Sequence, residues 1–413
     1  MHAFIISDVL PDIRFTGGQV LFKMLNNLPD IDFSIVWINQ WQLDYPKANE
    51  FPKNSKVISS FDFEPTEFTK KVQRSIDRLS SIKILLPIGL AFRGLMYYIR
   101  LLGISLKIII LIRLRRPDFI WLVLQGDKLA IIFSIIRFFN KDKVILLHQW
   151  DPITWWLKGS NRPQWFIGLM GSVVASLEKK AQLNIVPSKA WANKLILEKK
   201  NAHPVDNFFE DASFSYPYIN YHRPKILNAV FIGQLYANDE LTTICRDLLA
   251  FGERYKIEVI LHYFGPNKVT ELANIKVISH GFINPRQLTE EICIYDLALL
   301  PYPVAPDYAE TAKLSFPSKC RQYLQSGLPI LALAPIESGV HEFLVQSMPH
   351  QAYFNVQSDP QSNPNEFLDS IATLSYEEKK QLHLNVRHVG AKYFSASAEM
   401  LPFEKKLNEL VYP

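Results

Sequence analysis

The sequence of 413 residues has only three cysteines, Cys245, Cys293 and Cys320, all in its C-terminal half. So few cysteines, in an odd number, exclude the disulfide framework that stabilises small secreted proteins. The N-terminus lacks the basic segment that opens a signal peptide, and its residues have the pattern of a first strand. Cysteine and histidine do not cluster with metal-ligand spacing, so no bound metal is expected. These absences favour a cytoplasmic protein in a reducing compartment.

A long uncharged run is missing from the apolar and basic region 70–116. Its longest such run, Ile84 to Phe92, contains Pro87, whereas a spanning helix needs ~20 apolar residues. The region holds 11 basic residues and one acidic residue, Asp77. Basic residues among aliphatic ones are typical of helices that lie on an anionic membrane surface. We therefore expect peripheral attachment to the inner face of the cell membrane. The alternative is a buried core helix with a solvated basic face.

The net charge of +5 is unevenly distributed along the sequence. Residues 1–205 contain 28 Lys and Arg against 16 Asp and Glu, a balance of +12, whereas the remainder contains 17 against 24, a balance of −7. This asymmetry indicates an anionic partner for the N-terminal half, either a membrane or a nucleic acid. The basic residues lack the interleaved stacking aromatics of nucleic-acid binders, so we expect no nucleic acid.

Hydrophobic residues make up 48% of the sequence, which excludes a disordered chain, and its length favours two domains. Predicted strands and helices alternate in two series, separated by an aperiodic segment rich in aromatic residues, Asn and Pro. We therefore expect an α/β protein of two doubly wound Rossmann-like domains that face each other across a cleft. The expected divisions are an N-terminal domain at 1–205, a linker at 206–227, a C-terminal domain at 228–395 and a closing helix at 396–413.

The stretch 314–333 predicts a loop, a short helix and a buried strand. Ser315 is expected to cap the helix, and Pro317 to lie in its first turn, where a missing N–H costs nothing. Gly327 is expected to end the helix in the left-handed conformation, and the apolar run 328–333 has the pattern of a parallel strand. These features predict a helix whose N-terminus follows a loop.

The first turn of this helix, Pro317-Ser318-Lys319, predicts an anion site. Its backbone N–H groups have no acceptor within the helix, and they carry the positive end of the helix dipole. Lys319, expected at an exposed turn, adds a full charge, which makes the site suitable for a phosphate. The alternative is an ordinary amphipathic helix with a solvated lysine.

In open α/β sheets the ligand lies beyond the carboxyl ends of the strands. Several small, basic or imidazole-bearing residues follow predicted strands at such ends. They are Gly17, Gly18, His148, Gly233, Gly265, Gly281 and Pro317-Ser318-Lys319. Their shared placement favours ligand binding over local structural roles.

The sequence resembles the family-four-like glycosyltransferases of the GT-B fold along nearly its whole length. The resemblance rests on Phe231-Ile232-Gly233, on Val277 to Gly281, on Tyr295 to Pro301, on Phe316 to Lys319 with Tyr323-Leu324, and on Gly327 to Ile330. In the N-terminal half, Gly17-Gly18 is similar to the family's glycine loop, His148 to its histidine after a strand, and Val186-Pro187-Ser188 to its turn before the linker.

The resemblance implies a retaining transfer of a sugar from a UDP- or GDP-sugar, without metal, to a glycan or lipid-linked acceptor in polysaccharide or glycolipid biosynthesis. It implies that His148 acts nearest the chemistry, and that Gly17, Gly18, Trp150 and Asp151 bind the acceptor or sugar. The implied donor-binding residues are Gly233, Gln234, Gly265, Phe282, Pro317, Ser318, Lys319 and Gln322. Backbone N–H groups and a cation at the leaving diphosphate would stabilise the transition state.

Two departures from the family pattern leave an alternative open. The basic pair usual after the opening strand of the second domain is replaced by Gln234 to Asp239, which contains no Arg or Lys. The family's two glutamates fall at Leu314 and Gln322. The alternative function is therefore a non-catalytic relative that binds a nucleotide or glycan as an assembly partner.

Overall fold

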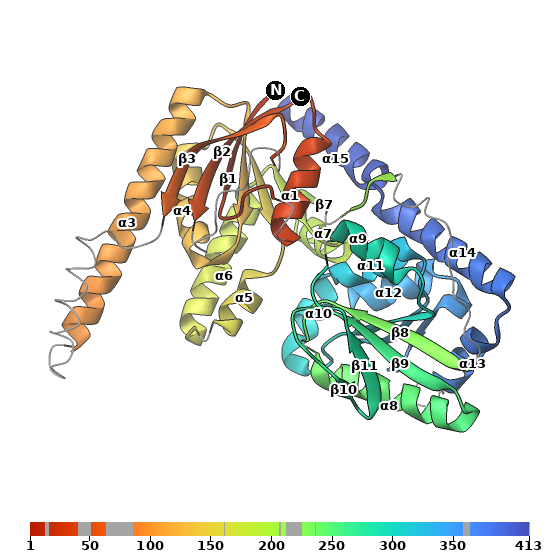
Figure 1. Cartoon of the computed structure of the whole chain (residues 1–413). Coiled ribbons are helices and arrows are strands. Elements are labelled where there is room, and N and C mark those ends of the chain that lie inside the picture. Colours follow the sequence, from red (N-terminus) through yellow and green to blue (C-terminus); the bar gives the residue numbers. More distant parts are fainter. Residues whose placement is uncertain are drawn as a thin grey trace. The chain divides into compact units, whose positions relative to one another are not determined.

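The computed structural model describes residues 1–12, 16–39, 51–62, 86–160, 162–205, 208–211, 225–235, 237–283, 285–357 and 364–412 (Figure 1). The chain divides into two compact units. Unit 1 comprises Met1–Pro187, Ala192–Asp206 and Phe403–Pro413, and unit 2 comprises Ser188–Trp191 and Asn207–Pro402. Of the predicted linker 206–227, only 208–211 and 225–227 fall within the described residues.

Unit 1 is built on a parallel sheet in the order β3-β2-β1-β4-β5-β6-β7. Its central strands are almost continuously apolar, as expected for strands covered on both faces. The strands are β1 (His2–Ser7), β2 (Asp32–Asn39), β3 (Ser55–Asp62), β4 (Phe119–Leu124), β5 (Val144–Gln149), β6 (Leu183–Val186) and β7 (Ala202–Pro204). The helices between them are α1 (Thr16–Asn26), α3 (Leu86–Arg115), α4 (Gly126–Phe139), α5 (Ile153–Gly159), α6 (Gln164–Lys180) and α7 (Lys189–Leu197).

Unit 2 repeats this architecture with the order β10-β11-β9-β8-β12-β13-β14, in which only β10 is antiparallel to its neighbour. Its strands are β8 (Ile226–Ile232), β9 (Glu258–Phe264), β10 (Glu271–Leu272), β11 (Ile275–Ser279), β12 (Leu297–Pro301), β13 (Ile330–Leu333) and β14 (Tyr353–Asn355). Its helices are α8 (Asn238–Tyr255), α9 (Pro285–Ile292), α10 (Ala309–Leu314), α11 (Ser318–Ser326), α12 (Gly339–Ser347), α13 (Pro364–Thr373), α14 (Tyr376–Phe394) and α15 (Ala396–Val411), the last of which ends in unit 1, and its 3-10 turns are Pro306–Tyr308 and His350–Ala352. The prediction of two doubly wound α/β domains is confirmed.

Each sheet has one topological switch point, where the chain leaves two adjacent strands in opposite directions. In unit 1 it lies between β1 and β4, and in unit 2 between β8 and β12. The carboxyl ends of these strand pairs are where open α/β sheets bind ligands. The fold therefore places one candidate site in each unit.

Helix α3 is one continuous helix of 30 residues within the region 70–116, for which the sequence predicted surface helices and an interruption at Pro87. Pro87 does not interrupt it, because the proline lies in its first turn, where the missing N–H has no partner to lose. The predicted basic residues at 70–85 lie outside the described residues. By length and composition alone, the segment Leu95–Arg115 is long and apolar enough to cross a membrane, with 33% of it buried against the protein.

Candidate functional site

Helix α11 of unit 2 begins two residues later than the sequence predicted. Pro317 is its N-cap, and Ser318 is its first residue. The prediction that Ser315 caps this helix is wrong. The Ser315 hydroxyl instead donates to the Thr311 carbonyl at 2.7 Å and pairs with the Tyr302 hydroxyl at 2.5 Å. The predicted stop at Gly327 is confirmed, because this residue has φ 82° and its N–H donates back to the last turn.

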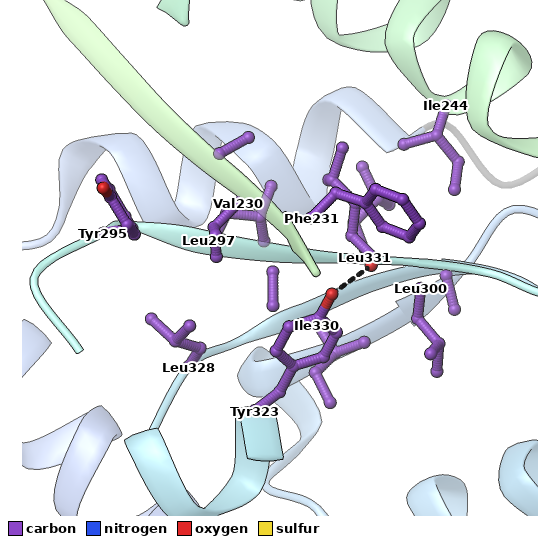
Figure 2. Packing of buried hydrophobic residues seen from close by; sticks show 14 of the residues in the cluster. Val230, Phe231, Ile244, Tyr295, Leu297, Leu300, Tyr323, Leu328, Ile330 and Leu331 are labelled. Carbon is purple, nitrogen blue, oxygen red and sulfur yellow. Dashed lines mark hydrogen bonds between the residues drawn. The ribbon is translucent and has the colours of Figure 1, made fainter. Parts of the chain in front are cut away.

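A buried tyrosine fixes α11 over the switch point of unit 2 (Figure 2). The hydroxyl of Tyr323 donates to the Leu299 carbonyl at 3.0 Å and accepts from the Ile232 N–H at 3.1 Å. Leu299 belongs to β12 and Ile232 to β8, so one side chain holds the helix to both strands that flank the switch point. The first turn of α11 is therefore held near the carboxyl ends of these strands.

Lys319, one turn before Tyr323, is buried, with 8% of its surface exposed. Its Nζ lies 4.4 Å from the ring centroid of Phe231, at the end of β8. Burial lowers the pKa of Lys319 to about 7. Both the exposed position predicted from the sequence and the alternative of a solvated lysine are wrong, since α11 packs this side chain against the sheet. A buried lysine with so low a pKa at a switch point is a candidate for anion binding.

Glycine is required at the ends of β8 and β9 for two different reasons, backbone conformation at Gly233 and lack of space at Gly265. Gly233 has φ 94°, which only glycine adopts easily, and its N–H donates to the Phe264 carbonyl at 2.8 Å. A Cβ on Gly265 would collide with the Tyr263 hydroxyl and the Gly233 carbonyl. The ends of β8 and β9 are thus in direct contact with each other. Gly233 itself is exposed, so its backbone is accessible to a ligand.

The remaining predicted donor-binding residues lie around this strand end with different exposures. Gln234 and Ser318 are exposed, Gln322 is half-buried, and Pro317 is buried. Phe282 is 75% exposed and follows Gly281, which has φ 75°. An exposed aromatic ring on a loop can stack on a flat ligand. In the described part of 233–240, no cation replaces the basic pair of the related family.

In unit 1, His148 lies on β5 and is fully buried. Neither ring nitrogen has a hydrogen-bond partner among the described residues. The ring lies 6.0 Å from that of Trp121 and 5.6 Å from that of Trp150, between centroids. Burial lowers the pKa of His148 to about 3, so the imidazole is neutral at physiological pH. It can donate or accept a hydrogen bond but does not serve as a charged acid.

The two glycines of the predicted glycine loop make close contacts within the protein itself. A Cβ on Gly17 would lie 2.5 Å from the Trp150 ring, and one on Gly18 would lie 2.6 Å from the Asp12 carbonyl oxygen. Both distances are too short for any side chain. Gly17 is therefore required for the packing of Trp150, a reason that the sequence did not disclose.

A small pocket opens at the carboxyl ends of β4 and β5. Its lining includes Gln125, Gly126, Trp150, Asp151 and Trp156. Trp150 and Asp151, both predicted to bind the acceptor or sugar, thus face the same pocket. Aromatic faces beside a carboxylate suit a sugar ring, which has apolar CH faces and polar hydroxyl edges. The pocket has room for about one water molecule, so a sugar ring would bind at its mouth, against Trp150 and Asp151, and not inside it.

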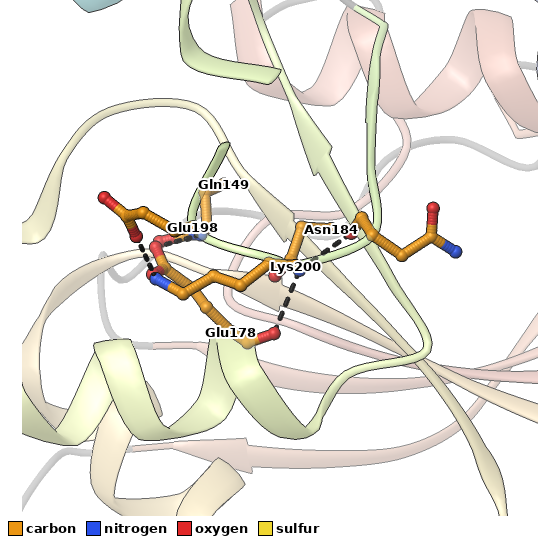
Figure 3. Close-up of polar contacts among 6 residues, drawn as sticks. Gln149, Glu178, Asn184, Glu198 and Lys200 are labelled. Carbon is orange, nitrogen blue, oxygen red and sulfur yellow. Dashed lines mark hydrogen bonds and ion pairs between the residues drawn. The ribbon is translucent and has the colours of Figure 1, made fainter. Parts of the chain in front are cut away.

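A polar cluster anchors the strand that carries His148 (Figure 3). Because side chains alternate along β5, Gln149 points to the opposite face, where its amide donates to Glu178 at 3.1 Å. Glu178 also pairs with Lys200 at 2.7 Å, and Lys200 pairs with Glu198 at 2.6 Å. Burial alone would lower the pKa of Lys200, but the hydrogen bonds to the two glutamates outweigh it and raise the pKa.

Two carboxylates near the switch point of unit 1 were not predicted as site residues from the sequence. Asp8 follows β1 and is fully buried, with its carbonyl accepting from Trp37 Nε1 at 3.0 Å. Asp127 begins α4 and pairs with Arg162 at 3.4 Å. Their positions directly after predicted strands were the available signal. The sequence also contains one short Asp-x-Asp segment, Asp30 to Asp32, which lies at the amino end of β2, away from the carboxyl ends of the strands. Within the described ranges, no three potential ligands gather to hold a metal ion.

No family model and no curated protein sequence matches the chain. It is similar over its whole length to solved structures of low sequence identity. One is a trehalose-6-phosphate synthase from E. coli bound with UDP-2-fluoro glucose, at 11% identity and a TM-score of 0.61, covering 100% of this chain and 99% of that one. Another is the UDP-forming α,α-trehalose-phosphate synthase of Burkholderia vietnamiensis, at 10% identity and a TM-score of 0.61, covering 99% and 98%. The chain has the GT-B fold.

The GT-B fold alone does not select one reaction. A UDP-N-acetylglucosamine 2-epimerase of Listeria monocytogenes is also similar, at 12% identity and a TM-score of 0.51, covering 99% of this chain and 96% of that one. The reaction of this chain therefore depends on its own site residues and not on the GT-B fold. Those residues are Lys319 on α11 in unit 2 and the tryptophan pocket beside His148 in unit 1.

Proposed function

We propose that this GT-B chain is a glycosyltransferase that moves a sugar, with retention, from a UDP-sugar to a glycan or lipid-linked acceptor. The observation that carries the proposal is Lys319, a buried cation at the N-terminus of α11, next to the exposed backbone of Gly233. A basic side chain at the first turn of a helix, over the end of a strand at a switch point, is placed where open α/β sheets bind anionic ligands.

The proposed chemistry follows from the charge that develops on the leaving group. As the glycosidic bond of the donor breaks, negative charge accumulates on the diphosphate. The free N–H groups of the first turn of α11 and the Lys319 ammonium stabilise that charge. A bound diphosphate also raises the pKa of Lys319, because an opposite charge favours the protonated form. Lys319 is then fully charged when it is needed.

His148 has a positioning and hydrogen-bonding role in this proposal. With its pKa lowered to about 3, it is a neutral imidazole that can hydrogen-bond a sugar hydroxyl. In a retaining transfer, the leaving diphosphate accepts the proton of the acceptor hydroxyl, so no protein base is required. The acceptor sugar binds at the mouth of the small pocket that Trp150, Asp151 and Trp156 line.

The choice of UDP over GDP is supported by the structural neighbours. The E. coli synthase is bound with UDP-2-fluoro glucose, and the Burkholderia vietnamiensis enzyme is UDP-forming. We place the reaction in the cytoplasm, because three cysteines in an odd number favour a reducing compartment. We assign it to polysaccharide or glycolipid biosynthesis, because a basic N-terminal half with exposed apolar residues suits an acceptor at an anionic membrane. If GDP and a GDP-sugar bind in place of UDP and a UDP-sugar, the donor assignment changes but the proposed reaction does not.

The second candidate function, a non-catalytic nucleotide-binding relative, is favoured by one observation. The described residues after β8 offer no cation to the diphosphate, and α8 instead begins with Asp239 and Glu240 in its first turn. Glu240 is engaged structurally, since its Oε1 accepts from the Val304 N–H at 2.9 Å. Such a protein would bind a nucleotide but would not turn it over.

The proposal is tested in two stages with the full chain. In the first, a panel of nucleoside diphosphates and their sugars is screened by thermal shift, and we expect UDP and one UDP-sugar to raise the melting temperature. No response across the panel would refute donor binding. In the second, the responding UDP-sugar is incubated with and without a bacterial lipid extract. Release of UDP together with labelled glycolipid supports transfer, binding without release supports the non-catalytic relative, and conversion of the sugar without acceptor supports an epimerase.

A further inference from the structure

Between Leu95 and Leu114, the side of α3 that faces away from the sheet carries a row of exposed aliphatic side chains. Six aliphatic side chains at helical spacing form this outer face, and each is between 45% and 73% exposed. They are Leu95, Ile99, Leu102, Leu106, Ile110 and Leu114. An ordinary surface helix presents polar residues to water on this side. The outer face therefore requires a partner that is not water.

The opposite side of α3 is apolar as well and is already covered. Leu101, Ile108 and Ile112 are buried in the core of unit 1, where α3 packs against α4. The helix is thus apolar on two sides, of which one is used by the fold. In Figure 1, α3 is the outermost helix on its side of the unit 1 sheet.

The charges around the outer face select an anionic partner. Between Leu86 and Arg116 the sequence contains no Asp or Glu, while Arg100, Lys107 and Arg113 are spaced along the helix and further arginines end it. Long basic side chains can extend their charges to anionic headgroups while aliphatic neighbours enter the acyl region. An apolar face with cations along it and no anion matches the interface of an anionic bilayer.

The sheet topology excludes a single crossing of the bilayer by α3. Strands β3 and β4, which precede and follow this helix, belong to the same parallel sheet of unit 1. A crossing by α3 alone would place these two strands on opposite sides of the membrane. The packing of α3 on α4 would also be lost. If a bilayer covers the outer face, the helix must therefore lie along the membrane surface.

We propose that the outer face of α3 inserts into the interfacial region of an anionic lipid bilayer, with the helix axis parallel to the membrane. Exposed Trp165 and Leu169 on α6 offer further apolar contacts on unit 1. On α5, exposed Trp155 is next to Trp156, which lines the small pocket of unit 1. If the proposed function holds, the acceptor of this enzyme is a lipid-linked glycan; the docking itself does not depend on that activity.

The test is flotation of the full chain with vesicles of phosphatidylcholine, with and without phosphatidylglycerol. We expect flotation only with the anionic vesicles, weakened by high salt and reversed by alkaline carbonate. The double variant Ile99→Glu with Leu106→Glu should lower partitioning by at least about tenfold, because it removes apolar contacts and adds repulsion. The matched control, Ile196→Glu with Leu197→Glu, changes two aliphatic residues on α7 that are at least as exposed, at 52% and 85%, and should bind as the unchanged chain does.

Equal loss in both double variants, equal binding to neutral vesicles, or resistance to carbonate would each overturn the proposal. So would a dimer in sedimentation that the α3 variant dissociates while the unchanged chain fails to float, since a second copy would then cover the outer face. Melting temperatures of both variants confirm that folding is retained, because the substituted side chains are exposed. Failure of the nucleotide-binding screen would leave these results unaffected.

Discussion

Lys319 gives the most direct measurable consequence of the candidate donor site. Burial lowers its pKa to about 7, so its charge changes in a range where binding is readily measured. We expect the affinity for a UDP-sugar to fall about tenfold for each pH unit above 7, until the pKa of the complex is reached, because binding then requires uptake of a proton. A nucleotide sugar is a suitable probe because both its phosphates are esterified and keep their charge throughout this range.

Lys319 also makes the stability of the protein without ligand depend on pH, and the free energy of unfolding decreases as the pH falls from 10.5 to 7. The pKa of Lys319 is lowered from 10.5 in the unfolded chain to about 7 in the folded one. Above pH 10.5 the amine is neutral in both states, and no stability is lost. As the pH falls towards 7, the unfolded chain takes up the proton first, which costs the folded state up to about 5 kcal/mol. Below about pH 7 the loss is complete and constant.

Replacing Lys319 with methionine should therefore separate folding from binding. The variant keeps the buried stem and loses the charge, so at pH 7 its melting temperature should be higher than that of the unchanged chain. Its affinity for the UDP-sugar at pH 6.5 should fall by about 1.5–3 kcal/mol, the value of a charge-assisted contact, and should no longer depend on pH.

Isothermal titration calorimetry between pH 6.5 and 9, in buffers of different ionisation enthalpy, measures both the affinity and the proton uptake. The matched control is Lys313→Met, since Lys313 is exposed on α10. It should leave the pH dependence unchanged. If Lys319→Met retains the slope and the proton uptake, another group titrates and the assignment of the diphosphate site to Lys319 is wrong.

Substitutions at three further positions, His148, Gly17 and Tyr323, test other parts of the two units. His148→Ala should lower turnover by roughly 10- to 1,000-fold while nucleotide binding survives, and His148→Gln should retain more activity; an unchanged rate in the alanine variant would make this residue structural. Gly17→Ala should destabilise the protein by about 1–3 kcal/mol and alter tryptophan fluorescence, because its Cβ would meet Trp150, whereas Gly103→Ala meets open space and should not. Tyr323→Phe should cost about 1–3 kcal/mol in chemical denaturation, since it leaves the Ile232 N–H buried without its acceptor; a smaller loss would mean that α11 is fixed by other contacts.

The sequence predicted those features that depend on neighbouring residues. Gly327 ends α11 in the left-handed conformation because the backbone there demands it, and the run after it forms the buried strand β13. The order of strands and helices followed from periodicity in the same way. The resemblance to GT-B glycosyltransferases then added the fold that the structural neighbours bear out.

Features that depend on distant residues could not be predicted. Ser315 fails as a cap because Tyr302, from another strand end, engages its hydroxyl. Lys319 is buried because Tyr323 holds its helix to two strands, and this contact spans 91 residues to Ile232. The requirement for glycine at Gly17 comes from Trp150, more than a hundred residues away along the chain. In each case the deciding contact is tertiary, which local pattern does not encode.

Buried ionisable groups connect the two units to one functional argument. A sequence that specifies a fold usually satisfies or neutralises its buried polar groups, and exceptions concentrate where binding or catalysis requires them. Within the described residues, His148 keeps both ring nitrogens without a hydrogen-bond partner, and Lys319 lies at 8% exposure over an aromatic ring. The first lies one strand from the switch point of its sheet, and the second lies over the switch point of the other. A sugar hydroxyl can hydrogen-bond the neutral imidazole of unit 1, and a bound phosphate would raise the lowered pKa of Lys319 in unit 2. Each unit, taken by itself, thus carries a buried group whose position and titration fit a ligand of the class that the proposed glycosyl transfer requires.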